Sequence, residues 1–177
     1  MIDAPARTLP DEWRAMRSED LQQVCTMADR IHRDHPERPE VFAAKLAAYP
    51  TGCFVLAKGA TLLGYALAHP YRLGMVPPLD TVMECLPGNA DCLYLHDIAI
   101  EPAIRGNGHT RSVIAALTTI AQEAGLTQLA LTALPGKSAF WKGKFGFEEP
   151  PEMPNSAALA TYGSGTLYLL KGVEPLP

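Results

Sequence analysis

A strand, a glycine-rich basic loop and a helix follow one another between Leu93 and Gly125, and this stretch constrains the fold more than any other. Residues 93–100 read L-Y-L-H-D-I-A-I, an apolar run without Gly or Pro that predicts a buried strand. Residues 112–125 place apolar side chains on one helical face and end at a glycine, which predicts an amphipathic helix. Gly106 and Gly108 in the loop between them permit positive φ angles and close approach of a ligand to the backbone.

The loop has the composition of an anion-binding site. A helix that starts after it points unpaired N–H groups and the positive end of its dipole back at the loop. Arg105 and Arg111 add full positive charges. A phosphate group is the expected ligand of such an arrangement.

Two common phosphate-binding motifs are missing from this loop. It lacks G-x-x-x-x-G-K-[ST], which argues against a nucleoside-triphosphate P-loop. It also lacks G-x-G-x-x-G with an acidic residue about 20 positions further on, which argues against a dinucleotide-binding fold. An ordinary tight turn with unrelated arginines is the alternative that the loop alone leaves open.

The loop resembles the R-x-x-G-x-[GA] signature of the GCN5-related N-acetyltransferase (GNAT) family, in which backbone amides hold the pyrophosphate of acetyl-CoA. Arg105 and Gly108 match its first and fourth positions, whereas Thr110 stands where the family has Gly or Ala. The phrase W-K-G-K-F-G-F at 141–147 is similar to the family's F-Y-x-K-x-G-F. Lys142 there replaces the tyrosine that often protonates the leaving thiolate, so the usual general acid is missing.

Composition fits a globular protein and excludes several other classes. With 177 residues, 47% hydrophobic and 19% charged, the chain is expected to form one domain over 1–177. A net charge of −4 without a basic run argues against nucleic-acid binding. The four scattered cysteines predict reduced thiols in a cytoplasmic protein, with no disulfide and no metal site. Neither a signal peptide nor an apolar stretch of about 20 residues is present, so no membrane association is expected.

The predicted elements alternate between helix and strand. In chain order we expect a short strand within 12–17, helices from Ser18 to Ile31 and from Pro39 to before Pro50, strands at 53–57 and 62–69, the central strand and helix, a strand at 128–133, a short helix at 138–145 and a strand at 165–171. This order predicts an α/β fold with a mixed sheet. The resemblance implies the GNAT arrangement, a mostly antiparallel central sheet flanked by helices.

Two proline-rich segments interrupt the regular pattern. Residues 70–91 hold four prolines and two glycines, and we expect at most one short helix there, at 81–85. Long ordered loops in compact domains are often functional, so this insertion is expected to shape the acceptor side. Residues 149–157 are expected to form a second loop.

The resemblance implies acetyl-CoA as co-substrate and assigns its binding residues by motif. The strand before the loop supplies main-chain contacts to the pantetheine arm at Ile98, Ala99 and Ile100. The loop holds the pyrophosphate through Arg105, Gly106, Asn107, Gly108, His109, Thr110 and Arg111. Lys142 is expected to hold the 3′-phosphate through its charge.

His96 is the predicted general base, because a histidine side chain ordinarily titrates near neutrality and this one interrupts an apolar strand. Strict alternation would place it on one face with Tyr94, Ile98 and Ile100, and Asp97 on the other face in a structural role. The alternative is a structural histidine bonded to a backbone carbonyl.

The predicted general acid is Tyr162, in the loop T-Y-G-S-G before the last strand, with Tyr94 and Tyr168 as alternatives. His32 and His35 flank the break between the first two helices. They either line the acceptor site or lie on a solvated surface, and the second is the simpler expectation.

The leading hypothesis is an acetyl-CoA-dependent N-acetyltransferase, an acyltransferase that acts on a small-molecule or peptide amine. A homodimer is the family-level expectation. Two other classes stay open: a CoA-binding regulatory module without turnover, suggested by Thr110 and Lys142, and a domain that binds a nucleotide other than CoA.

Overall fold

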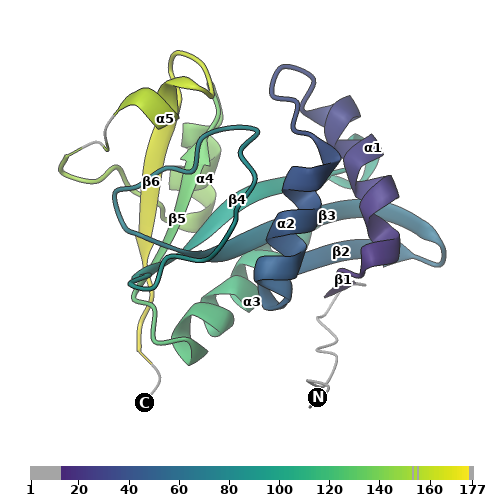
Figure 1. The fold of residues 1–177 in the computed structure, drawn as a ribbon, viewed down its shortest axis with the longest axis horizontal. Helices are drawn as coiled ribbons and strands as arrows, with labels where there is room; N and C mark the ends of the chain where they lie inside the picture. Colours follow the sequence, from purple (N-terminus) through teal and green to yellow (C-terminus); the bar gives the residue numbers. More distant parts are fainter. Residues whose placement is uncertain (1–12, 153, 155, 176–177) are drawn as a thin grey trace.

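A six-stranded sheet forms the centre of the fold in the computed structural model, which describes residues 13–152, 154 and 156–175. The strands are β1 (Trp13–Ala15), β2 (Cys53–Lys58), β3 (Thr61–Tyr71), β4 (Cys92–Ile100), β5 (Gln128–Ala133) and β6 (Leu167–Gly172). They lie side by side in chain order, and every neighbouring pair is antiparallel except β4 and β5, which are parallel. The predicted α/β class and mostly antiparallel sheet are therefore confirmed (Figure 1).

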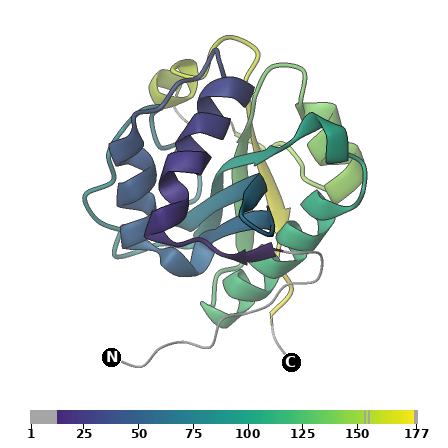
Figure 2. The ribbon, with the colours of Figure 1, turned by 90° about the vertical axis from the view of Figure 1, so that its right-hand side faces the viewer.

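Helices cover both faces of this sheet. They are η1 (Ser18–Asp20), α1 (Leu21–Ile31), α2 (Pro39–Ala48), η2 (Pro50–Gly52), η3 (Pro102–Ile104), α3 (His109–Glu123), α4 (Ser138–Phe145) and α5 (Ser156–Ala160). Figure 2 shows three layers, with α1 and α2 on one side of the sheet and α3 and α4 on the other. The helix expected from Ser18 to Ile31 divides into η1 and α1. The short helix α5 and the 3₁₀ turns η2 and η3 were not predicted from the sequence.

Apolar cores fill the space between the sheet and the helices on both of its faces. On one face, Val113, Leu117 and Ile120 of α3 pack with Leu93 and Leu95 of β4. On the other, Val24 and Met27 of α1 and Phe42 of α2 pack with Tyr65 and Leu67 of β3. The spacing of apolar residues in these helices is what buries one stripe of each against the sheet.

A β-bulge in β4 alters which side chains share a face. Leu67 of β3 pairs with Asp97 and Ala68 with Leu95, so His96 is the extra residue without a partner on β3. Because a bulge adds one residue to one strand, alternation is broken at that point. Ile98 and Ile100 consequently lie in the α3 core, whereas His96 and Asp97 both point toward α1 and α2. The prediction that His96 shares one face of the strand with Ile98 and Ile100 is therefore wrong.

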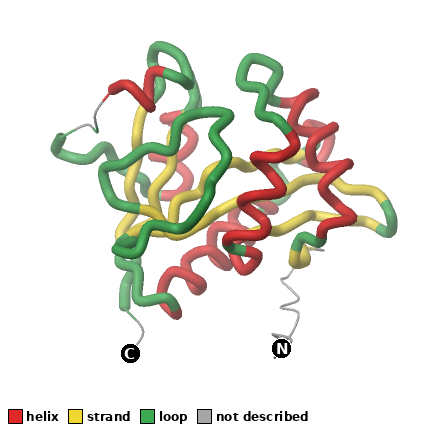
Figure 3. Tube along the Cα trace, in the orientation of Figure 1, coloured by secondary structure: helices red, strands yellow, loops and turns green. Residues whose placement is uncertain are grey.

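The segment between β3 and β4 crosses the same face of the sheet as α2 (Figure 3). It contains no helix, so the short helix expected at 81–85 does not form. Val76 is buried against Tyr94 and Tyr168, and the Gly74 N–H donates to the Tyr168 hydroxyl at 3.1 Å. These contacts make the segment an ordered cover over the second half of the sheet.

Candidate functional site

The two central strands pair only along part of their length. The parallel ladder between β4 and β5 runs from Cys92 to Leu95 on β4, and its last pair joins Leu95 to Leu131. β4 continues to Ile100, so beyond Leu95 its edge toward β5 has no partner strand within the described part of the chain. This open edge contains the main chain of Ile98, Ala99 and Ile100, the residues predicted to contact pantetheine.

The glycine-rich loop lies at the end of this open edge and adopts the predicted left-handed conformation. Gly106 and Gly108 have φ angles of 88° and 91°, and a Cβ built at either position meets no atom within 4 Å. Positive φ, rather than crowding by the protein, is therefore what favours glycine at both positions. The space in front of the loop stays available to a ligand.

The helix after this loop begins earlier than predicted. α3 starts at His109 rather than Ser112, and its first turn includes Thr110 and Arg111. The N–H of Ser112 donates to the Gly108 carbonyl at 3.1 Å. The amides of the first turn precede that bond and have no carbonyl one turn earlier in the helix, which leaves them directed out of the helix end. The Trp13 indole donates to the His109 carbonyl at 3.2 Å and so ties this turn to β1.

The positive side chains predicted to bind phosphate groups, Arg105, Arg111 and Lys142, all make contacts within the protein. The Arg105 Nε–H donates to the Ile100 carbonyl at 2.9 Å, which links the loop to the end of β4. The Arg111 guanidinium lies 6.0 Å from the centre of the Phe145 ring. Lys142, on α4, forms an ion pair with Glu149, and both side chains are largely exposed. Asn107 is exposed within the loop.

His96 is bound by a carboxylate that the sequence did not reveal. Its Nε2 lies 2.9 and 3.1 Å from the two carboxylate oxygens of Glu37, and the two side chains are 1% and 5% exposed. Burial alone would raise the pKa of Glu37, but the hydrogen bond from His96 and the charges of His96 and Lys45 lower it. The predicted alternative, a bond from His96 to a backbone carbonyl, is not what the structure has at Nε2.

Asp97 forms a second histidine–carboxylate pair beside the first. His32 Nε2 lies 2.9 Å from Asp97 Oδ1, and the Tyr65 hydroxyl donates to Asp97 Oδ2 at 2.6 Å. Burial opposes ionisation of Asp97, but His32 and Tyr65 hold its pKa below the ordinary value. For His32, burial acts to lower the pKa, and Asp97 raises it overall. His32 is therefore not a solvated surface residue, and neither is His35, whose Nε2 lies 2.8 Å from the Tyr162 carbonyl.

Two further buried ionisable side chains belong to the same region. Lys45 is 2% exposed on α2, and burial lowers its pKa although Glu37 and Asp97 oppose this. His69 is fully buried on β3, where burial lowers its pKa to about 3. Two sequence signals could have revealed these buried residues. Lys45 interrupts the apolar stretch V-F-A-A-K-L-A-A, and His69 ends the strand L-L-G-Y-A-L-A-H.

The three candidate tyrosines are all buried and hydrogen-bonded. The Tyr162 hydroxyl donates to the Pro77 carbonyl at 2.7 Å, and the Tyr94 hydroxyl lies 2.5 Å from Thr132 Oγ1. The Tyr168 hydroxyl accepts the Gly74 N–H. Burial raises the pKa of each phenol. All three hydroxyls therefore serve the packing of the protein in this state.

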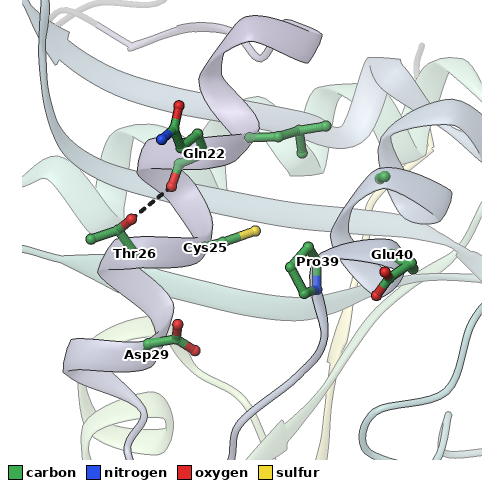
Figure 4. A pocket seen from close by; sticks show the side chains of 8 residues that line it. Gln22, Cys25, Thr26, Asp29, Pro39 and Glu40 are labelled. Carbon is green, nitrogen blue, oxygen red and sulfur yellow. Dashed lines mark hydrogen bonds between the residues drawn. The ribbon is translucent and has the colours of Figure 1, made fainter.

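A surface hollow between α1 and α2 lies apart from this region (Figure 4). Its volume is about 510 Å³, and its lining includes Cys25, Asp29, Pro39 and Glu40. Burial and the two carboxylates raise the pKa of the Cys25 thiol. No residue of β4 or of the glycine-rich loop lines this hollow, so it is not part of the candidate site.

The described residues contain neither a membrane-spanning helix nor a metal-binding cluster. None of the helices there is both long and apolar enough to cross a membrane. Within residues 13–152, 154 and 156–175, no three histidine, cysteine or acidic side chains gather in a way that could hold a metal ion.

Solved structures with the same architecture are numerous. A structure of Ard1 from Thermoplasma volcanium is 12% identical, with a TM-score of 0.68 over 92% of this chain and 97% of that chain. A GphF GNAT-like decarboxylase in complex with isobutyryl-CoA is 13% identical, with a TM-score of 0.71 over 92% and 99%. The ribosomal-protein-S18-alanine N-acetyltransferase from Escherichia coli is 16% identical, with a TM-score of 0.60 over 93% and 95%. At such identities these likenesses establish the fold.

The sequence itself establishes the family. No curated protein matches the chain. Residues 13–147, however, match the acetyltransferase (GNAT) family, and this range runs from β1 through the G-F pair after α4. The match includes the open edge of β4, the glycine-rich loop and the first turn of α3. This chain is a member of the GNAT family.

Proposed function

We propose that this protein is an acetyl-CoA-dependent N-acetyltransferase that acts on a small-molecule or peptide amine. The observation that carries the proposal is the continuity of three parts: the open edge of β4, the α3 amides at its end, and His96 beside its start. Family membership supports acyl-CoA as the donor. Structural neighbours include a NatC complex bound to a Gag peptide and CoA, and a ribosomal-protein-S18-alanine N-acetyltransferase. One domain over 1–177, a homodimer and a cytoplasmic location remain predictions.

The residues present fit a CoA thioester. An extended pantetheine arm can pair with a strand edge as an added strand, and the unpaired main chain of Ile98, Ala99 and Ile100 provides such an edge. The amides from Gly106 to Arg111 and the charge of Arg105 would hold the pyrophosphate. Lys142 would hold the 3′-phosphate after leaving Glu149.

Acetyl transfer to an ammonium requires two proton movements. His96 takes one proton from the ammonium, and the neutral nitrogen then attacks the thioester carbonyl carbon. The N–C bond forms and the C–S bond breaks. An acid protonates the leaving thiolate and recovers its proton from the new amide nitrogen. Tyr162 is the proposed acid, and its hydroxyl would have to leave the Pro77 carbonyl to act.

Ligand binding and turnover test the proposal separately. Thermal shifts with CoA, acetyl-CoA, ATP and NAD should show stabilisation by the two CoA compounds alone, because a ligand that binds only the folded state raises its stability. Thiol release from acetyl-CoA should then depend on one class of amine. Stabilisation by CoA without turnover of any amine would favour a regulatory module, and stabilisation by ATP or NAD would overturn the CoA site.

Gly108→Val should abolish detectable CoA binding. Valine resists the φ of 91° at this position, and its side chain would occupy the space in front of the loop. Gly88→Val is the matched control, because Gly88 also has open space around a Cβ but lies in the long loop without a positive φ. A folded Gly108→Val protein that binds CoA as tightly as the parent would contradict the assigned loop.

A further inference from the structure

Next to the proposed active site, one buried carboxylate contacts the ring of His96. His96 Nε2 is within hydrogen-bond distance of both oxygens of Glu37. An ionised carboxylate has only acceptor atoms, so the nitrogen that faces it carries the hydrogen. In the neutral ring the lone pair therefore belongs to Nδ1.

Nδ1 is buried and has no hydrogen-bond partner among the described residues. It is bonded to Cγ and is thus the ring nitrogen nearer to the main chain. The His96 side chain is 1% exposed, yet the residue as a whole is partly exposed, so the accessible atoms belong to its main chain. That main chain begins the open edge of β4. A buried lone pair without a donor costs free energy, and a proton relayed from the amine to Nδ1 through one water would remove that cost.

The orientation of Glu37 is itself fixed by the long loop between β3 and β4. The Asp80 N–H donates to Glu37 Oε1 at 3.0 Å. Asp80 has a φ of 53°, a left-handed conformation that is costly for a residue other than glycine. The Arg38 N–H and Nε–H hold the Asp80 carboxylate at 2.7 and 2.9 Å, and a terminal guanidinium nitrogen donates to its carbonyl. The loop is therefore held by hydrogen bonds to Arg38, the residue that follows Glu37.

We propose that Glu37 is a positioning residue that keeps His96 in the Nε2–H form, so that Nδ1 is the atom that accepts the proton from the amine. This inference rests on the proposed function and assigns the insertion a role, because the Asp80 peptide holds the Glu37 carboxylate in place. Glu37 does not touch the reacting atoms and acts only through His96.

Other ionisable groups lie around the pair formed by His96 and Glu37. They come from the α1–α2 linker, α2, β3, β4 and the loop before β6: Glu37, Lys45, Tyr65, His69, Tyr94, Asp97 and Tyr162. The histidine–carboxylate pair of His32 and Asp97 is the natural control, because it lies beside His96 without contacting its ring.

The first experiment needs no acceptor. Two-dimensional ¹⁵N–¹H spectra of the ring nitrogens distinguish the tautomers of all five histidines, and His96→Gln identifies the His96 signals by their loss. We expect the unmodified protein at neutral pH to show a protonated Nε2 and an unprotonated Nδ1 at His96. The opposite tautomer would overturn the proposal, whether or not an amine substrate is known.

The second experiment uses Glu37→Gln, with His32→Gln as control. With an amine that the protein acetylates, Glu37→Gln should lower kcat at least about tenfold, with the KM for acetyl-CoA nearly unchanged. The fixed Nε2–H tautomer should be lost in Glu37→Gln alone, since an amide can either accept from the ring nitrogen or donate to it. A Glu37→Gln protein with the parental kcat and tautomer would overturn the positioning role. If the tautomer is as expected and no amine reacts, the proposed function fails while the positioning of His96 by Glu37 stands.

Discussion

Two histidine–carboxylate pairs lie next to each other at the centre of this protein. They differ in burial, and β4 supplies the histidine of one pair and the carboxylate of the other. In the first, β4 supplies His96 and the α1–α2 linker supplies Glu37. In the second, β4 supplies Asp97 and the end of α1 supplies His32. The side chains of the first pair are 1% and 5% exposed, whereas those of the second are 20% and 15% exposed.

The bulge explains how consecutive residues of one strand come to face the same helices. A regular strand would direct His96 and Asp97 to opposite faces. The extra residue in β4 directs both toward α1 and α2 instead. The difference in burial then decides the roles of the two pairs. Charges in the buried pair interact strongly with each other, whereas water screens charges in the partly exposed pair. The buried pair is suited to hold a proton at a defined atom, and the more exposed pair anchors the linker.

The largest expected effect comes from breaking the buried pair. Glu37→Ala should lower the free energy of unfolding by about 3–5 kcal/mol, because it leaves two donors without an acceptor, at about 1–3 kcal/mol each. They are the buried His96 Nε2–H and the Asp80 N–H. Urea unfolding followed by circular dichroism measures the change. A cost below about 1 kcal/mol, typical of exposed pairs, would show that the two pairs do not differ as their burial indicates.

Removing the tyrosine that supports the second pair should have the next largest effect. Tyr65→Phe deletes the hydroxyl that donates to Asp97 at 2.6 Å from a fully buried ring. Hydrogen bonds to charged groups contribute about 1.5–3 kcal/mol, and we expect that loss in urea unfolding. Phe42 packs against the Tyr65 ring and should keep the new phenylalanine in place. An unchanged free energy of unfolding would mean that His32 alone satisfies the Asp97 carboxylate.

A third histidine, without a carboxylate partner, should dominate the pH dependence of stability in mild acid. His69 has a pKa of about 3 because it is buried, so the folded protein resists protonation there. Its stability contribution is complete above the unfolded pKa of about 6.5 and is lost as the pH falls below it. The slope it adds is about 1.4 kcal/mol per pH unit. His69→Phe, which suits the adjoining Tyr71 and Tyr94 rings, should reduce that slope between about pH 6.5 and pH 5.

Local sequence signals predicted the elements well and the site only in part. The glycines of the loop, Pro39 at the start of α2 and Gly146 after α4 each act through backbone conformation near their own position, so the sequence reveals them. The partnership of Glu37 with His96 joins residues 59 positions apart, and no local pattern encodes it. The bulge is likewise invisible in an apolar strand, because it depends on the register with β3.

The smallest expected effect, and the one with the opposite pH dependence, belongs to the partly exposed pair. Asp97 raises the pKa of His32 against the effect of burial, so the folded protein binds a proton there more tightly than the unfolded chain. The stabilisation is complete below the unfolded pKa of about 6.5 and is lost as the pH rises through the higher folded value. His32→Gln should therefore cost about 0–1 kcal/mol near pH 5.5 and less near pH 9. Urea unfolding at both pH values gives the difference. A cost that grows with pH would mean that His32 is neutral in the folded protein, and that the pair is a neutral contact with none of the ionic character assigned to it.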